Sequence, residues 1–155
     1  MKHVLVVAGF LIAVGALSFL AAAATQDKQE RKPDEKKEAV FFSVDKAKFK
    51  EVAKGASMAV VWGDPEKGAY RAFTKFEPGA DFPMHTHTNA LRIVVVKGAY
   101  VFRPENGEVK RVGPGCFLET QAGERHASGG DATEGALFYQ ESAGTFDLVP
   151  VETKK

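Results

Sequence analysis

From position 39 onward, the chain consists of short apolar segments separated by turns rich in glycine and proline. The segments 56–62 (ASMAVVW) and 91–97 (LRIVVVK) are rich in strand-forming residues and are short for helices. The turns 63–65 (GDP) and 113–115 (GPG) each mark the end of an apolar segment. A chain of many short strands with little helical pattern is expected to fold as an all-β sandwich or barrel.

The same pattern predicts where the individual strands lie. We expect one short helical turn within 45–52, and a hairpin turn at Asn106-Gly107, because Asn-Gly suits the tight turns that join antiparallel strands. The expected strands are 40–42, 56–62, 69–76, 91–97, 99–102, 109–112, 116–120, 136–141 and 146–151.

The N-terminal region differs in composition from the rest of the chain. Residues 1–24 combine Lys2, a long apolar run and a final stretch of four consecutive alanines, which is typical of a cleaved secretory signal peptide. An uncleaved membrane anchor is the alternative, because the apolar run is close to spanning length. Residues 25–38 (TQDKQERKPDEKKE) are almost all polar and are predicted to be a flexible linker. We therefore expect a secreted or periplasmic protein with one domain at 39–155.

Charge and cysteine content narrow the classes of partner and of cross-link. Outside residues 1–24, basic and acidic side chains are equal in number, so the chain lacks the positive charge that nucleic-acid binding requires. Cys116 is the only cysteine, which excludes an internal disulfide, and we expect it to be a small buried apolar residue. The domain must therefore be stabilised by its apolar core.

Three histidines form the candidate metal site. His85 and His87 make an H-x-H pair, and His126 follows a glycine-containing turn. Residues i and i+2 of a strand point to the same side, so such a pair can bind one ion from one wall. Neutral imidazole is the commonest ligand for divalent transition metals. The pattern predicts one bound divalent metal: Fe, Mn, Zn, Ni or Cu.

The region from Gly79 to Gly130 resembles the two sequence motifs of the cupin superfamily. Gly79, five residues and His85-Thr86-His87 match the first motif, which Gly98 closes. Gly115, five residues, Gln121-Ala122-Gly123, two residues and His126 keep the spacing of the second. The resemblance implies a jelly-roll β-barrel with a metal held by His85, His87 and His126.

One departure from the cupin pattern affects the site directly. The family motif has a glutamate ligand four or five residues after the H-x-H pair, and this chain has Leu91 and Arg92 there. Either Arg92 points inward and binds an anionic substrate, for which we have a slight preference, or Leu91 fills the pocket and Arg92 pairs with an acid. Other residues considered as a fourth ligand, and not favoured, are Glu119, Gln121, Gln140 and Glu141.

Several activities are compatible with the resemblance. Our first hypothesis is a metal-dependent enzyme, similar to cupin dioxygenases or isomerases, acting on a small organic anion such as a carboxylate. The alternative is a non-catalytic metal- or ligand-binding sensory module, and a degenerate cupin without metal is the third possibility. The resemblance also implies a homodimer. If the signal is cleaved, we expect no stable membrane insertion.

Overall fold

The computed structural model describes residues 39–152. The predicted signal peptide at 1–24 and linker at 25–38 lie outside these residues, as do positions 153–155. Within the described part, no helix is long and apolar enough to cross a membrane. The only helix there is a single 3-10 turn, Val44–Lys46.

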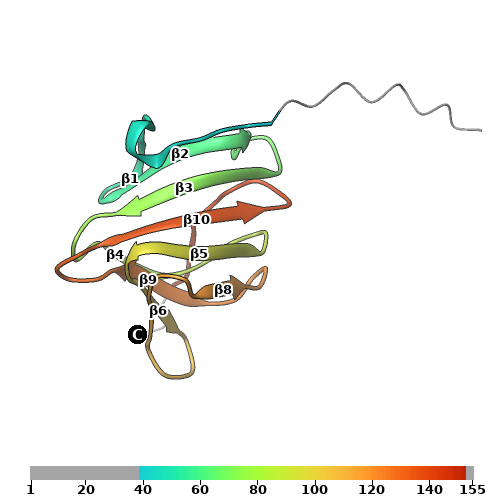
Figure 1. Ribbon diagram of the computed structural model, residues 1–155. Helices are drawn as coiled ribbons and strands as arrows, with labels where there is room; N and C mark the ends of the chain where they lie inside the picture. Colours follow the sequence, from blue (N-terminus) through green and yellow to red (C-terminus); the bar gives the residue numbers. More distant parts are fainter. Residues whose placement is uncertain (1–38, 153–155) are drawn as a thin grey trace, which may run out of the picture. The chain divides into compact units, whose positions relative to one another are not determined.

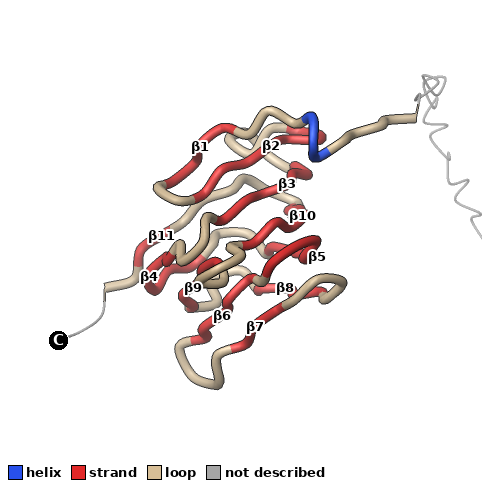
Figure 2. The backbone as a smooth tube through the Cα atoms, turned by 60° about the vertical axis from the view of Figure 1, so that its left-hand side comes forward, coloured by secondary structure: helices blue, strands red, loops and turns tan. Residues whose placement is uncertain are grey.

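The described chain forms two antiparallel sheets, which Figures 1 and 2 show from two sides. The first sheet has six strands in the order β1 (Lys50–Ala53), β2 (Ala56–Gly63), β3 (Tyr70–Phe76), β10 (Ala136–Ser142), β5 (Leu91–Gly98) and β8 (Phe117–Thr120). The second has five strands in the order β11 (Val149–Pro150), β4 (Asp81–Thr86), β9 (His126–Gly130), β6 (Tyr100–Pro104) and β7 (Lys110–Val112).

The chain crosses between the two sheets several times. Strand β10 lies between β3 and β5, and β9 lies between β4 and β6, so strands far apart in sequence are neighbours. Among the described residues, no ladder pairs a strand of one sheet with a strand of the other. The predicted all-β class is confirmed, whereas the expected barrel is not closed by hydrogen bonds.

The main apolar core lies between the facing sides of the two sheets. On β5, Ile93 and Val95 are buried, whereas the alternate residues are more exposed, as expected for a sheet with one buried side. Rings from both sheets meet in this core: the ring centroid of Tyr100 on β6 lies 5.5 Å from that of Phe76 and 5.2 Å from that of Phe138. Burial of such residues contributes about 1.5–3 kcal/mol each.

Most of the predicted strands are confirmed, with four differences. Residues 40–42 form no strand, and the segment 45–52 contains the 3-10 turn and the start of β1 instead of one helical turn. The β6–β7 hairpin is present, but its loop is longer than a two-residue turn because the strands end at Pro104 and resume at Lys110. The last predicted strand shrinks to β11.

Two strands of the structure, β4 and β9, were not predicted from the sequence. Strand β4 contains Pro83, which a strand pattern disfavours. Strand β9 ends in Gly129 and Gly130, whose lack of side chains permits very close backbone packing. A Cβ atom at Gly129 would lie 2.4 Å from the carbonyl oxygen of Ala80. These two strands carry two of the three candidate ligands.

Candidate metal centre

The three predicted histidines meet between β4 and β9. Pairing of these strands places His85 directly opposite His126, with their ring centroids 4.5 Å apart. His87, just beyond the end of β4, points to the same side as His85, and their ring centroids are 4.9 Å apart. All three side chains are buried, and one ring nitrogen from each lies within 4.8 Å of the others. The histidines are therefore positioned to bind a single metal ion.

The turn before His126 holds the two histidine segments together. Gly123 donates its backbone N–H to the carbonyl oxygen of His87 at 2.9 Å. Gly123 has a φ of 74°, a left-handed conformation that glycine adopts without strain. A side chain at this position would strain the turn that fixes His87 relative to His126.

Each imidazole is oriented by a backbone carbonyl group. Nδ1 of His85 lies 2.7 Å from the oxygen of Pro83, and Nδ1 of His126 lies 3.1 Å from that of Glu124. Nδ1 of His87 lies 2.5 Å from the oxygen of Asp147. A carbonyl oxygen only accepts hydrogen bonds, so Nδ1 must carry the proton in all three rings. In the neutral rings, Nε2 then has a free lone pair, as metal-ligating histidines require.

The surroundings keep these rings neutral. Burial lowers the pKa of His85 and of His126, and burial lowers the pKa of His87 to about 4. The Nε2 atom of His126 is buried and has no hydrogen-bond partner. An unpartnered buried nitrogen is costly, and a bound metal would satisfy it. The donor set and its electrostatics therefore fit a divalent transition metal.

The segment 143–148, between β10 and β11, lies against His87, and we call it the strap. The Asp147 carboxylate accepts hydrogen bonds from the backbone N–H of Thr88 at 2.8 Å and from its hydroxyl at 2.5 Å. The Phe146 ring lies 5.7 Å from the ring of His87, and the backbone N–H of Phe146 donates to Pro65. The strap thus fixes both the carbonyl group that orients His87 and the residue that follows it. Nothing in the sequence separates this aspartate from other surface acids.

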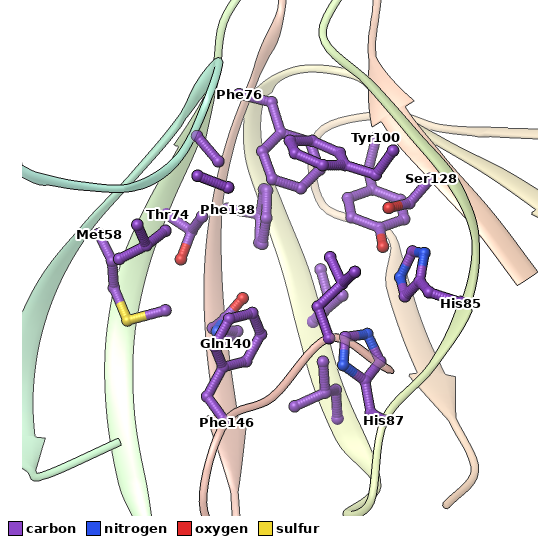
Figure 3. A pocket seen from close by; sticks show the side chains of 17 residues that line it. Met58, Thr74, Phe76, His85, His87, Tyr100, Ser128, Phe138, Gln140 and Phe146 are labelled. Carbon is purple, nitrogen blue, oxygen red and sulfur yellow. The ribbon is translucent and has the colours of Figure 1, made fainter. Parts of the chain in front are cut away.

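A cavity of about 80 Å³ lies beside His85 and His87 (Figure 3). Among the described residues that line it, none is an Asp, Glu, Lys or Arg. Its polar groups, apart from the two histidines, come from Thr74, Tyr100, Ser128 and Gln140. Its apolar lining comes from Val52, Ala53, Ala56, Met58, Phe76, Phe82, Leu91, Ile93, Phe138, Phe146 and Leu148.

Arg92 lies away from this cavity, which corrects the preferred expectation for this position. Leu91 is 3% exposed and lines the cavity, whereas the Arg92 side chain is 49% exposed. Arg92 sits opposite Glu119 on β8, and its Nη2 lies 3.2 Å from the Glu119 carboxylate. The alternative, an arginine paired with an acid and a leucine in the pocket, matches the structure. The two positions could not be separated in the sequence because the turn after His87 hides the strand alternation.

The other fourth-ligand candidates also lie mostly outside the cavity. Glu141 accepts a hydrogen bond from Tyr139, and Gln121 is exposed. Gln140 is the one candidate that lines the cavity, where its amide nitrogen donates to the Tyr70 hydroxyl at 2.8 Å. Within residues 39–152, the cluster of potential ligands contains the three histidines and no carboxylate. Cys116 is exposed, so the expectation that it is buried was wrong.

Comparisons with known proteins agree with this architecture. The model of the ChrR cupin-like domain family matches residues 37–144. The polyketide cyclase RemF from Streptomyces resistomycificus matches with a TM-score of 0.63 and 18% identity, over 74% of this chain and 87% of that one. KdgF from Halomonas sp. matches with a TM-score of 0.55 and 24% identity, over 66% and 94% respectively. An RmlC-like cupin from Shewanella frigidimarina matches with a TM-score of 0.55 and 17% identity, over 68% and 92%. No curated protein matches the chain significantly. At these identities, the solved structures establish similarity of fold alone.

Proposed function

Because the chain belongs to the ChrR cupin-like domain family, we propose that it binds one divalent transition metal and presents it to a small organic molecule. His85, His87 and His126 are the proposed metal ligands, and the cavity beside His85 and His87 is the proposed site for the organic ligand. One observation carries this proposal. All three Nδ1 atoms face carbonyl oxygens, so all three Nε2 lone pairs remain for an ion.

Three protein ligands are fewer than the coordination number of any candidate metal, which leaves positions for an exogenous ligand. When bound, the metal would supply Lewis-acid or redox chemistry to a molecule in the cavity. Imidazole ligands suit Zn, Fe, Ni and Cu, and Mn is also a candidate. Three histidines alone do not select one of these five metals. Three neutral rings leave the full charge of the ion uncompensated, which favours an anionic donor, such as a carboxylate, at the open position.

The residues of the cavity limit how catalysis could proceed. Burial raises the pKa of Tyr100 to about 12, so its hydroxyl stays protonated at neutral pH and can donate a hydrogen bond or a proton. No described residue of the lining offers a carboxylate or an amine as a general base. An enzymatic reaction would therefore depend mainly on polarisation of the substrate by the metal. The same lack of a base favours the second candidate function, a non-catalytic binding or sensory module.

The proposal includes two features predicted from the sequence and the family. We propose that the protein is exported, because residues 1–24 have the composition of a secretory signal. We also propose a homodimer. Size-exclusion chromatography with light scattering tests the dimer, and N-terminal sequencing of exported protein tests cleavage.

Metal content tests the central part of the proposal. The full chain would be purified without an affinity tag or chelators and measured by plasma mass spectrometry. We expect near one metal ion per chain, and its loss in His85→Ala and in His126→Ala. Glu119→Ala is the control, because Glu119 pairs with Arg92 outside the cavity. Equal metal content in all four proteins would refute the site assignment. Incubation of the metal-bound protein with small organic acids, followed by NMR, then separates the two candidate functions: product formation indicates an enzyme, and binding alone indicates a sensory module.

A further inference from the structure

We infer that the ligand of this cavity has one metal-binding end and an uncharged, mostly apolar body with a hydrogen-bonding group that Thr74 and Gln140 recognise. The inference rests on the proposed function, because one end of the ligand must meet the metal. It narrows the expected substrate class from organic anions in general to molecules with a single charged end.

Thr74 carries the first part of the argument. Its side chain is on β3, is 3% exposed and lines the cavity. The hydroxyl oxygen is buried and has no hydrogen-bond partner in the protein. Valine has nearly the same shape without a hydroxyl group, so apolar packing alone does not require threonine here. In Figure 3, Thr74 lies next to Phe138, on the side of the cavity opposite the histidines. A ligand with a donor or acceptor group would satisfy this hydroxyl.

Gln140 supplies a second buried polar group on the neighbouring strand β10. Its amide nitrogen donates to the Tyr70 hydroxyl at 2.8 Å, which fixes the orientation of the amide. The side-chain carbonyl oxygen then remains as an acceptor in a side chain that lines the cavity. Thr74 and Gln140 are diagonal neighbours on β3 and β10, because Thr74 pairs with Phe138 and Gln140 with Ala72, and they lie across the cavity from His85 and His87 (Figure 3). Together they can donate to, and accept from, one polar group of a ligand.

Most of the remaining lining of the cavity is apolar. It includes Met58, Ile93 and Phe138, its other polar groups are those of Tyr100 and Ser128, and none of the described lining residues is formally charged. A second charge on the ligand would lose its hydration without gaining a partner, which is strongly unfavourable. The volume of about 80 Å³ is also small. A cavity of about 150 Å³ is known to accept benzene, so this smaller cavity favours a short, slender ligand body.

Three four-carbon carboxylates test this inference on the zinc-bound full chain. Butanoate, 4-hydroxybutanoate and succinate share one carboxylate for the metal and end in a methyl, a hydroxyl and a second carboxylate. Isothermal titration calorimetry should show that 4-hydroxybutanoate binds about tenfold more tightly than butanoate, as expected for one additional hydrogen bond. Succinate should bind more weakly than both.

A matched pair of variants assigns the preference to its residue. Thr74→Val should abolish the preference, so that 4-hydroxybutanoate binds no more tightly than butanoate to this variant. Thr120→Val is the control, because the Thr120 hydroxyl is also buried without a partner but does not line the cavity. It should preserve the preference.

Four outcomes would overturn the inference: succinate binding as tightly as butanoate, equal binding of the hydroxylated and methyl-ended probes, a preference that persists in Thr74→Val, or no binding of any probe to zinc-bound protein. Zinc content is measured first. If the wild-type chain binds no zinc or other metal, the proposed function itself fails, and the inference falls with it.

Discussion

Removal of the Asp147 carboxylate should weaken metal binding although Asp147 contributes no side chain to the histidine cluster. Its carboxylate bonds to the N–H and hydroxyl of Thr88, and its backbone carbonyl orients His87. Without the carboxylate, the carbonyl remains, but the strap loses the contacts that hold it beside the ligand. We therefore assign Asp147 as a positioning residue and expect Asp147→Ala to affect both stability and metal affinity.

The structure sets the size of both effects. Hydrogen bonds to a charged group contribute about 1.5–3 kcal/mol when buried. Asp147 is only partly buried, so about 0.5–1 kcal/mol per bond is more appropriate, or roughly 1–2 kcal/mol of unfolding free energy for the two. Loss of groups that orient metal ligands lowers affinity by about 10–100-fold. Because the carbonyl partner of His87 is retained, we expect the lower end, about tenfold.

Urea unfolding and competition with a zinc-chelating dye measure the two effects. Asp131→Ala is the control: the Asp131 carboxylate also accepts hydrogen bonds from the N–H and hydroxyl of a threonine, Thr133, and further ones from the N–H of Glu134 and from Arg111, but it is not bonded to any histidine. The control should lose stability and keep its zinc affinity. If Asp147→Ala loses stability yet binds zinc as tightly as Asp131→Ala does, the strap does not orient His87.

Three further predictions follow from burial and position. The metal-free protein should lose stability as the pH falls from 6.5 towards 4, because the unfolded chain takes up a proton that buried His87, with its pKa of about 4, does not. The difference between the His87 pKa in the unfolded chain, about 6.5, and in the folded chain corresponds to a loss of ~3 kcal/mol of unfolding free energy. An unfolding free energy in urea that does not change with pH in this interval would contradict the prediction. Arg92→Leu should leave zinc content unchanged and alter stability by less than about 1 kcal/mol, since Arg92 forms an exposed ion pair with Glu119; loss of zinc would show that Arg92 supports the site. Thr120→Val should raise the unfolding free energy by about 1 kcal/mol, because it removes a buried hydroxyl without a partner. A destabilised variant would mean that this hydroxyl is satisfied in solution.

The cluster of three histidines could be predicted from the sequence because it depends on local spacing. The i, i+2 arrangement of His85 and His87 and the glycine-containing turn before His126 are short-range features. The pairing of β4 with β9 then joins them. The contacts that the sequence did not reveal are between residues far apart in the chain. The carbonyl group that orients His87 comes from Asp147, 60 residues away.

The composition of the cavity was only partly accessible from the sequence. The alternation on β5 separates Leu91, Ile93 and Val95 from Arg92, Val94 and Val96, but the turn after His87 hid which of these two faces lines the cavity. Thr74 was not singled out, because a threonine in a strand is common and its lack of a hydrogen-bond partner is a tertiary property. The cavity therefore emerged only from the packing of the two sheets.

X-ray absorption spectroscopy of the metal that copurifies with the full chain tests the central claim most directly. The account predicts near one metal ion per chain, coordinated by three imidazole nitrogens at about 2.0–2.1 Å if the metal is zinc. Oxygen donors from water or a bound carboxylate would complete the coordination shell. His126→Ala should reduce the imidazole contribution or abolish binding. A metal-free wild-type chain, or a bound metal without imidazole ligands, would contradict the assignment of His85, His87 and His126 as a metal site.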